Sequence, residues 1–347
     1  MEQIIVIRGH GSISVLGHDA TSISESYQSG RTHFQLVDDT PVAALQYQAA
    51  ALIEQIFQEH NYRGLDRCVI MAIYAARQAV KNAGWELERN VVINIGSSRG
   101  ATGLSEHYFN QFKNTGRVSP STSPVTTLGN VSSWVGQDLN SRGARISHSV
   151  TCSTGLQAIA NGFAWLKSGM ADKFLAGASE APLTPFTIAQ MKALGIYSDD
   201  SCSPYPCRPL NISKKNTFVL GEGAAVFALE RISHQQLLSD TSNPVIIESV
   251  GFGFEQISSK TGISTQGNGF KSAIQDALEH SRDNSAPDMI ILHAPGTVAG
   301  DFAELNAIKS LFSTSQIPVL CSGKWMTGHT LGASGCLTLE YAIWILK

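Results

Sequence analysis

This sequence of 347 residues lacks the features that mark membrane-spanning, secreted and nucleic-acid-binding proteins. No apolar run reaches the roughly 18 residues that a membrane-spanning helix needs. The opening segment has neither the basic stretch nor the cleavage site of a secretory signal peptide. Charged residues make up only 15%, the net charge is -3, and no cluster of lysine and arginine marks a nucleic-acid-binding face. We therefore expect neither a membrane span nor a nucleic acid partner, and much surface buried in a thick core or against another subunit.

The cysteines also exclude two kinds of site. There are six of them, at positions 68, 152, 202, 207, 321 and 336. They form no CxxC pair and show no spacing typical of a metal site or of a disulfide framework. We therefore predict no metal and a location in the reducing cytoplasm.

The alternation of predicted elements describes the fold. Strands are expected at 4–7, 91–95, 145–151, 173–178, 217–229, 245–250, 289–292 and 319–321. Helices are expected at 43–58, 65–83, 156–167, 187–194, 270–280, 302–311 and after 335, with a glycine-rich turn at 8–17 and a loop-like insertion at 101–144. Two successive βαβα runs predict an α/β fold built from a duplicated unit, with mixed, largely parallel sheets. The N-terminal half spans 1–235 and the C-terminal half 244–347.

Cys152 occupies the turn around which the first half is arranged. It follows a β-branched stretch and precedes a helix with one apolar face, in the sequence Thr-Cys152-Ser-Thr-Gly155. A helix N-terminus lowers the pKa of a thiol, so this position is typical of a nucleophile. The alternative is that Cys152 is only a small buried apolar side chain.

Polar residues of the second half follow its strands directly. His293 comes after the strand at 289–292, Asp301 and Glu304 follow shortly after, and Lys324 and His329 follow the strand at 319–321. The carboxyl ends of strands are where ligands gather in α/β sheets. A single histidine there is often a satisfied core residue, but two histidines with a lysine favour a function. The turn Gly332-Ala-Ser-Gly335 looks like the counterpart of the Cys152 turn, so both should face one site.

At these motifs the chain resembles the β-ketoacyl-acyl carrier protein synthases, the condensing enzymes of the thiolase superfamily. The resemblance is carried by Thr-Cys152-Ser-Thr-Gly, His293-x-x-Gly-Thr297, Asp301-x-x-Glu304, Lys324-x-Met-Thr-Gly-His329 and Phe218-Val-Leu-Gly-Glu-Gly223, which arrive in the family's order. It implies the duplicated, five-layer αβαβα thiolase-like fold. It also implies a homodimer, or a heterodimer with a related synthase subunit, and acyl carrier protein as partner.

The resemblance also implies a role for each residue. Cys152 would accept the acyl group, and its backbone N–H would form part of an oxyanion hole. His293 and His329 would act as neutral imidazoles that donate hydrogen bonds to the enolate left after malonyl decarboxylation. Lys324 and Glu304 would support the histidines, although a buried ion pair without catalytic duty is an equal alternative. Thr297 and Thr327 would bind substrate. No cofactor is expected on the chain itself, because phosphopantetheine comes with the carrier protein.

Two departures from the family pattern leave other functions open. Pro295 stands where the family has a threonine, and the sequence ends before the last strands and gating loop of the family, so the fold is expected to lack them. The chain could instead be a thiolase acting on CoA esters, a non-catalytic partner similar to a chain-length factor, or a Cys–His hydrolase. The pathway expected is fatty acid or polyketide synthesis, including pigments of the aryl-polyene type.

Overall fold

A mixed six-stranded sheet forms the centre of the N-terminal half. The computed structural model describes residues 3–86, 90–256, 262–283, 285–312 and 317–347. The strand order is β5-β4-β6-β8-β1-β9. Their bounds are β1 Gln3–Ser14, β4 Val92–Gly96, β5 Arg145–Ile146, β6 Lys173–Glu180, β8 Gly223–Ser233 and β9 Val245–Ile247. β5, β4 and β6 run parallel, whereas β8, β1 and β9 continue the sheet antiparallel. The expectation of largely parallel sheets is therefore wrong for β8, β1 and β9.

Smaller sheets and the helices complete the described chain. β2 Gln35–Val37, β3 Thr40–Ala43 and β7 Leu220–Gly221 form one sheet, and β10 Met289–Ile291 and β11 Val319–Cys321 form another. The helices of the first half are α1 Ala20–Ser29, α2 Tyr47–Gln58, α3 Arg67–Asn82, α4 Thr102–Thr115, α5 Thr122–Thr126, α6 Asn130–Asp138, α7 Thr154–Ser168, α8 Pro185–Ala193 and α9 His234–Leu238. Those of the second half are α10 Asn268–Glu279, α11 Val298–Leu311, α12 Lys324–Thr327 and α13 Ser334–Leu346, with a 3₁₀ turn at Leu331–Ala333.

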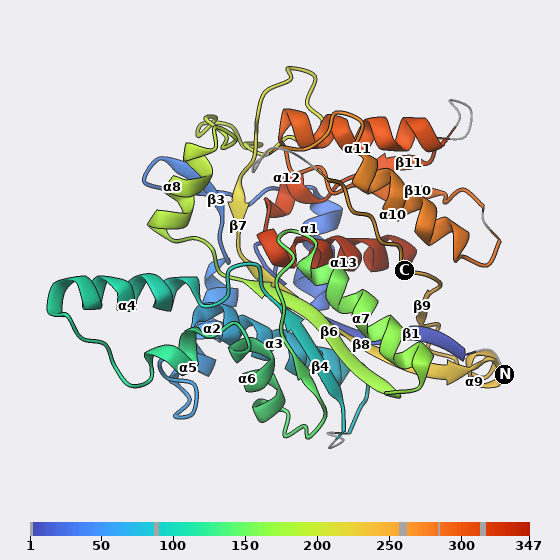
Figure 1. The fold of residues 1–347 in the computed structure, drawn as a ribbon, viewed down its shortest axis with the longest axis horizontal. Coiled ribbons are helices and arrows are strands. Elements are labelled where there is room, and N and C mark those ends of the chain that lie inside the picture. The colour runs from blue at the N-terminus through green and yellow to red at the C-terminus, as the bar shows by residue number, and fades with distance from the viewer. Residues whose placement is uncertain (1–2, 87–89, 257–261, 284, 313–316) are drawn as a thin grey trace.

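The layers follow from which faces are apolar. α2, α3 and α6 pack on one face of the large sheet, and α7 and α13 pack on the other. α10 and α11 cover β10 and β11 through a separate apolar cluster. In Figure 1, α7 and α13 lie side by side between the large sheet and the elements of the C-terminal half. This is the five-layer αβαβα order, and it brings the N-terminal ends of α7 and α13 together.

The first strand is longer than predicted. The turn expected at 8–17 is wrong, because β1 continues to Ser14 with a bulge between Ile7 and Gly9. Gly9 and Gly11 instead allow α3 to approach the sheet: a Cβ on Gly11 would lie 2.4 Å from the backbone oxygen of Ala75. These glycines serve close packing rather than chain reversal.

Three further segments differ from the sequence-based expectation. The insertion at 101–144 folds into α4, α5 and α6 instead of a loop, and α4 projects from the body of the molecule in Figure 1. β5 covers only two residues of the strand expected at 145–151. β9 pairs with β1 and so extends the first sheet rather than opening the second. Met1 and Glu2, part of the opening segment tested for a signal peptide, lie outside the described residues.

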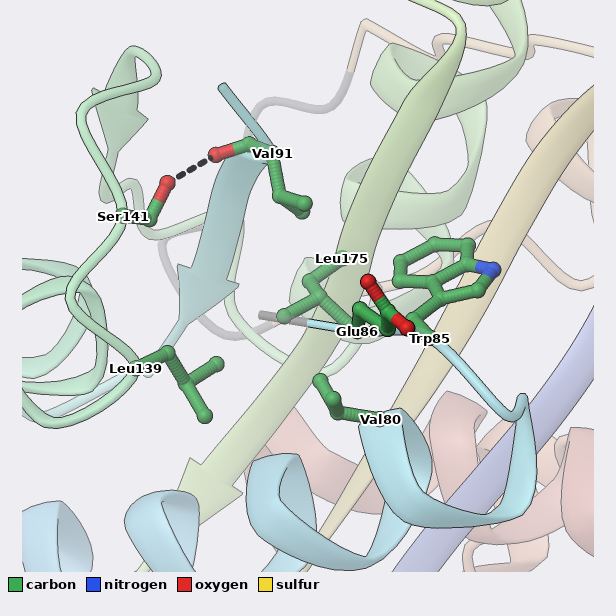
Figure 2. Close-up of a pocket in the computed structure, with 7 residues that line it drawn as sticks. All are labelled: Val80, Trp85, Glu86, Val91, Leu139, Ser141 and Leu175. Carbon is green, nitrogen blue, oxygen red and sulfur yellow. Dashed lines mark hydrogen bonds between the residues drawn. The ribbon is translucent and has the colours of Figure 1, made fainter. Parts of the chain in front are cut away.

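Two further features concern membrane-spanning helices and a small pocket. None of the helices in the described ranges combines the length and apolarity needed to cross a membrane. A small pocket, shown in Figure 2, lies near the amino-terminal ends of β4 and β6 and is lined by Val80, Trp85, Glu86, Val91, Leu139, Ser141 and Leu175. Apart from Glu86 and Ser141 its lining is apolar, and it contains none of the predicted site residues.

Candidate active site

Cys152 lies in a tight turn just before α7. Thr151 has a φ of 50°, a left-handed conformation that is uncommon outside glycine. The side-chain oxygen of Thr154 accepts from the N–H of Val150 (2.9 Å) and donates to the carbonyl of Thr151 (2.6 Å). These bonds fix the backbone on both sides of Cys152. Among the described residues no backbone carbonyl accepts from the N–H of Cys152, which lies beside its own sulfur.

The protonation state of Cys152 differs from the sequence-based expectation. Burial raises the pKa of the Cys152 thiol above its ordinary value, and nearby Glu180 adds to the rise. The positive charge of Lys324 and the residue's own N–H act in the opposite direction but do not overcome the burial. The lowered pKa expected from the helix N-terminus is therefore not found, because the effect of burial exceeds the effects of Lys324 and the N–H. The raised pKa favours the thiol form of Cys152.

Hydrogen bonds of its backbone and of its ring fix the position of His329. Its N–H donates to the carbonyl of Val219 (2.7 Å), and its carbonyl accepts from the N–H of Gly221 (3.0 Å). The N–H of Leu331 donates to Nδ1 of His329 at 3.0 Å. A nitrogen that accepts a hydrogen bond carries the lone pair, so the proton of the neutral ring is on Nε2. His329 can therefore donate a hydrogen bond from Nε2.

His293 is positioned through the two acidic residues that follow it. The Glu304 carboxylate accepts from the N–H groups of His293 and Ala294, both at 2.7 Å. Asp301 accepts from the N–H of Gly296 at 3.0 Å. Both carboxylates are buried in the first half of α11, and they hold the 293–296 turn in a conformation where Ala294 has a φ of 26°.

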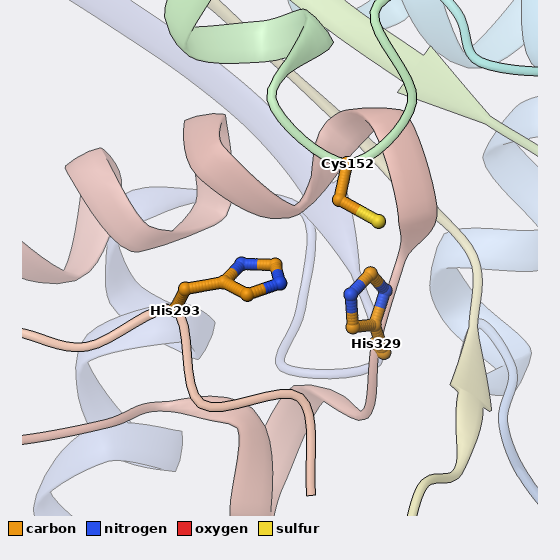
Figure 3. Close-up of side chains that lie close together, drawn as sticks. All are labelled: Cys152, His293 and His329. Carbon is orange, nitrogen blue, oxygen red and sulfur yellow. The ribbon is translucent and has the colours of Figure 1, made fainter. Parts of the chain in front are cut away.

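The structure brings Cys152, His293 and His329 together. One ligand atom from each lies within 4.8 Å of the others, and the two imidazole rings are nearly perpendicular with centroids 5.3 Å apart. Figure 3 shows the thiol and both rings pointing toward one another from separate segments. Burial and the charge of Lys324 lower the pKa of His293 to about 3, and burial and neighbouring His293 and Lys324 place that of His329 well below its ordinary value. Both rings are neutral at ordinary pH.

Lys324 is buried at the start of α12 and does not pair directly with Glu304. Its side chain is 3% exposed, and its Nζ has no hydrogen-bond partner. Among the residues that the structure describes, no ion pair to Glu304 is formed, so the alternative of a buried ion pair is not supported. Burial lowers the pKa of Lys324, while the surrounding acidic groups, Glu304 first, raise it. Lys324 acts on the site through its charge rather than through a bond.

The two threonines predicted to bind substrate are already engaged. Thr297 caps α11, where its side-chain oxygen accepts from the N–H of Gly300 at 3.3 Å. The hydroxyl of Thr327 faces two backbone carbonyls, those of Gly323 (3.3 Å) and Gly328 (3.0 Å). Their substrate-binding role stays a prediction. Because the Thr327 hydroxyl donates its proton to a backbone carbonyl, Thr327 could only accept a hydrogen bond from a substrate.

The three clustered side chains also have the spacing of a metal site. A thiolate and two imidazoles suit a soft ion such as Zn²⁺. Coordination by His329 would require Nε2 to lose its proton to Nδ1, where the N–H of Leu331 already points. The donor set therefore fits hydrogen-bond donation better than metal coordination.

Sequence reasoning missed Glu180. This residue ends β6 and is fully buried, and its carboxylate reaches both the loop after β4 and the turn after His329. The available signal was a charged residue shortly after the apolar and small residues Phe174 to Ala178, just beyond the predicted end of the strand at 178.

Two family models together match almost the whole chain. Residues 5–235 match the model of the β-ketoacyl synthase N-terminal domain, and residues 246–347 match that of the C-terminal domain. The chain is 29% identical to 3-oxoacyl-[acyl-carrier-protein] synthase 2 of Staphylococcus aureus, over 99% of this chain and 85% of the relative. It is 28% identical to a putative polyketide β-ketoacyl synthase 1 of Streptomyces halstedii, over 97% of this chain and 84% of the relative.

Solved structures show the same fold. The ishigamide ketosynthase/chain length factor superposes with a TM-score of 0.83 at 21% identity, covering 98% of this chain and 85% of that one. The predicted thiolase-like fold is thereby confirmed.

Proposed function

The chain belongs to the β-ketoacyl synthase family of the thiolase superfamily, and from that premise we propose that it is a decarboxylating condensing enzyme. Its substrates would be an acyl group and a malonyl unit, each carried as a thioester on the phosphopantetheine of an acyl carrier protein. The observation that supports this best is the convergence of Cys152, His293 and His329 within 4.8 Å, with a protonated Nε2 on His329.

In the first half-reaction the Cys152 sulfur attacks the thioester carbonyl of the acyl carrier protein. The new C–S bond forms at Cys152, the bond to the phosphopantetheine sulfur breaks, and the thiol proton leaves with that sulfur. The backbone N–H of Cys152 faces the developing oxyanion.

In the second half-reaction malonyl thioester loses CO2 and leaves an enolate. His329 donates to the enolate oxygen from Nε2, and His293 supplies a second neutral imidazole on the same side. The carbanion then attacks the acyl carbonyl, forming the C–C bond and releasing the Cys152 thiolate, which takes up one proton. The products are a β-ketoacyl thioester, free carrier protein and CO2.

A partnership with a second subunit extends this proposal. A structurally similar ketosynthase was solved together with a chain length factor. We propose that this chain forms a homodimer or a heterodimer with a related synthase subunit, in fatty acid or polyketide synthesis.

The second candidate is a non-catalytic partner. Pro295 favours it, because proline lacks the hydroxyl of the family's threonine beside His293.

The test is mass spectrometry of the purified protein after incubation with acyl-carrier protein, followed by malonyl-carrier protein. An acyl adduct on Cys152, absent from Cys152→Ala, and subsequent CO2 release support the condensing enzyme. An unmodified Cys152, under conditions that acylate a control synthase, supports the partner role. An adduct with no CO2 release but with transfer to CoA supports a thiolase.

A further inference from the structure

The carboxylate of Glu180 joins the two halves of the chain beside the proposed site. Glu180 is 0% exposed at the end of β6. Its Oε1 accepts from the hydroxyl of Ser97 (2.8 Å) and the N–H of Arg99 (3.1 Å). Its Oε2 accepts from the N–H (2.7 Å) and hydroxyl (2.6 Å) of Ser98 and from the N–H of Gly332 (3.0 Å). Four of these five donors belong to the loop after β4, and the fifth crosses to the C-terminal half.

This arrangement requires an ionised carboxylate. The Ser97 hydroxyl accepts from the N–H of Gly100 at 2.9 Å, so its own proton is directed to Glu180. Five donors to two oxygens leave no place for a proton on Glu180. Burial raises the pKa of this carboxyl above its ordinary value, although the hydrogen bonds act in the opposite direction and supply charge compensation for a buried anion.

Gly332 allows the crossing bond because it has no side chain. A Cβ there would lie 2.6 Å from Oε2 of Glu180 and 2.7 Å from the N–H nitrogen of Ser98. The contact between the halves is therefore made directly by backbone, with no flexible side chain from the Gly332 side.

Leu331 connects this bond to His329. Leu331 has a φ of 45°, and its N–H is the donor to Nδ1 of His329. A left-handed non-glycine residue persists only where its surroundings hold it. The bond from Gly332 to Glu180 fixes the peptide that follows Leu331, so it contributes to holding the Leu331 N–H on the imidazole.

We propose that Glu180 is a positioning residue that sets the tautomer of His329: through Gly332 and Leu331 it keeps the proton of the neutral ring on Nε2. Among the described residues Glu180 makes no hydrogen bond to Cys152, His293 or His329, although its charge contributes to the raised pKa of Cys152. The inference rests on the proposed function for its catalytic consequence, but its structural part, the tautomer, can be tested without any reaction.

The experiment compares Glu180→Gln with Glu340→Gln, an equal change at a fully buried glutamate outside the site. The glutamine amide offers one acceptor oxygen and turns an NH2 group toward N–H donors. The tautomer is read from ¹⁵N chemical shifts of ¹⁵N-histidine-labelled protein, with the His329 signals assigned by their loss in His329→Gln. Turnover is measured with acyl- and malonyl-carrier protein, as kcat and KM separately.

We expect one protonated Nε2 on His329 in the unaltered chain and in Glu340→Gln, and mixed tautomers in Glu180→Gln. We also expect kcat to fall roughly tenfold or more in Glu180→Gln with KM little changed, up to the roughly 10²–10³-fold loss seen when an oxyanion donor is removed. A His329 tautomer unchanged in Glu180→Gln overturns the inference, whatever happens to kcat. If the protein performs no condensation but the tautomer shifts, the inference stands and the proposed function fails.

Gly332→Ala provides the second variant in case Glu180→Gln does not fold. Its Cβ would lie 2.6 Å from Oε2 of Glu180 and 2.7 Å from the backbone nitrogen of Ser98, so this variant displaces the bond between Gly332 and Glu180 without removing the carboxylate. The same mixed tautomers are expected, and a single Nε2-protonated form in this variant would equally overturn the inference.

Discussion

The N–H of Leu331 donates a 3.0 Å hydrogen bond to Nδ1 of His329, two residues earlier in the same turn. This single contact assigns the proton of a neutral imidazole to Nε2 and makes a buried histidine a hydrogen-bond donor within the cluster of Cys152, His293 and His329. Its consequence is chemical rather than structural, because either tautomer would fill the same volume. The neutral state is secured separately, since burial and the charges of His293 and Lys324 keep the pKa of His329 low.

The donor role of His329 predicts the effect of its removal. His329→Ala should slow CO2 release from malonyl-carrier protein by roughly 10²–10³-fold, as expected for one lost oxyanion donor. His329→Gln should retain part of the rate, because its amide carries an N–H donor. The measurement is single-turnover CO2 release by enzyme acylated beforehand on Cys152. Release by His329→Ala at the unaltered rate would contradict the assignment.

Lys324 should set the titration of Cys152 through its charge. The ammonium lowers the pKa of the Cys152 thiol, so Lys324→Met should raise that pKa further and move the pH profile of alkylation to higher pH. The second-order rate of iodoacetamide alkylation of Cys152, followed by peptide mass spectrometry from pH 6 to pH 10, measures this. Lys309→Met, an exposed lysine on α11, is the matched control and should leave the profile in place. A shift to lower pH in Lys324→Met would refute the electrostatic role.

Glu304 should matter for stability as well as for rate. Its carboxylate accepts two backbone N–H bonds at 2.7 Å, and the amide of Glu304→Gln can accept only one of them well. A buried donor left unsatisfied costs about 1–3 kcal/mol, so the free energy of unfolding in urea should fall by that amount. CO2 release should fall too, because the 293–296 turn loosens. Glu279→Gln, exposed on α10, should change neither quantity.

The parts of the fold that could be predicted are those that depend on local sequence patterns. Apolar periodicity located α3, α7 and β6, and polar residues at strand ends identified His293 and His329. What failed depends on neighbours distant in sequence. The glycines of β1 resemble a turn in the sequence, but in the fold they allow α3 to pack closely on the strand. The raised pKa of Cys152 depends on its burial, which no local motif encodes. Glu180 could not be assigned, since its partners lie about 80 and 150 positions away.

Glu340 predicts a pH dependence of stability that is independent of catalysis. This residue of α13 is fully buried, and within the described part of the chain it bonds only to neutral hydroxyls, those of Ser12 and Tyr27 (3.5 Å for the latter); burial raises its pKa from 4.5 to about 7. A carboxyl with a raised folded-state pKa binds more protons in the folded than in the unfolded state between those values. Its contribution to stability is therefore complete below about pH 4.5 and is lost as the pH rises toward 7.

The loss amounts to about 3 kcal/mol on the scale of 1.36 kcal/mol per pKa unit. Glu340→Gln stays neutral at every pH, so the free energy of unfolding of this variant should exceed that of the unaltered chain by more at pH 8 than at pH 5. Urea unfolding at the two pH values measures the difference, and comparing the two proteins cancels the contributions of all other titrating groups. A difference between them that is the same at pH 5 and pH 8 would mean that Glu340 is ionised throughout, with a counter-charge that the hydroxyls of Ser12 and Tyr27 do not provide.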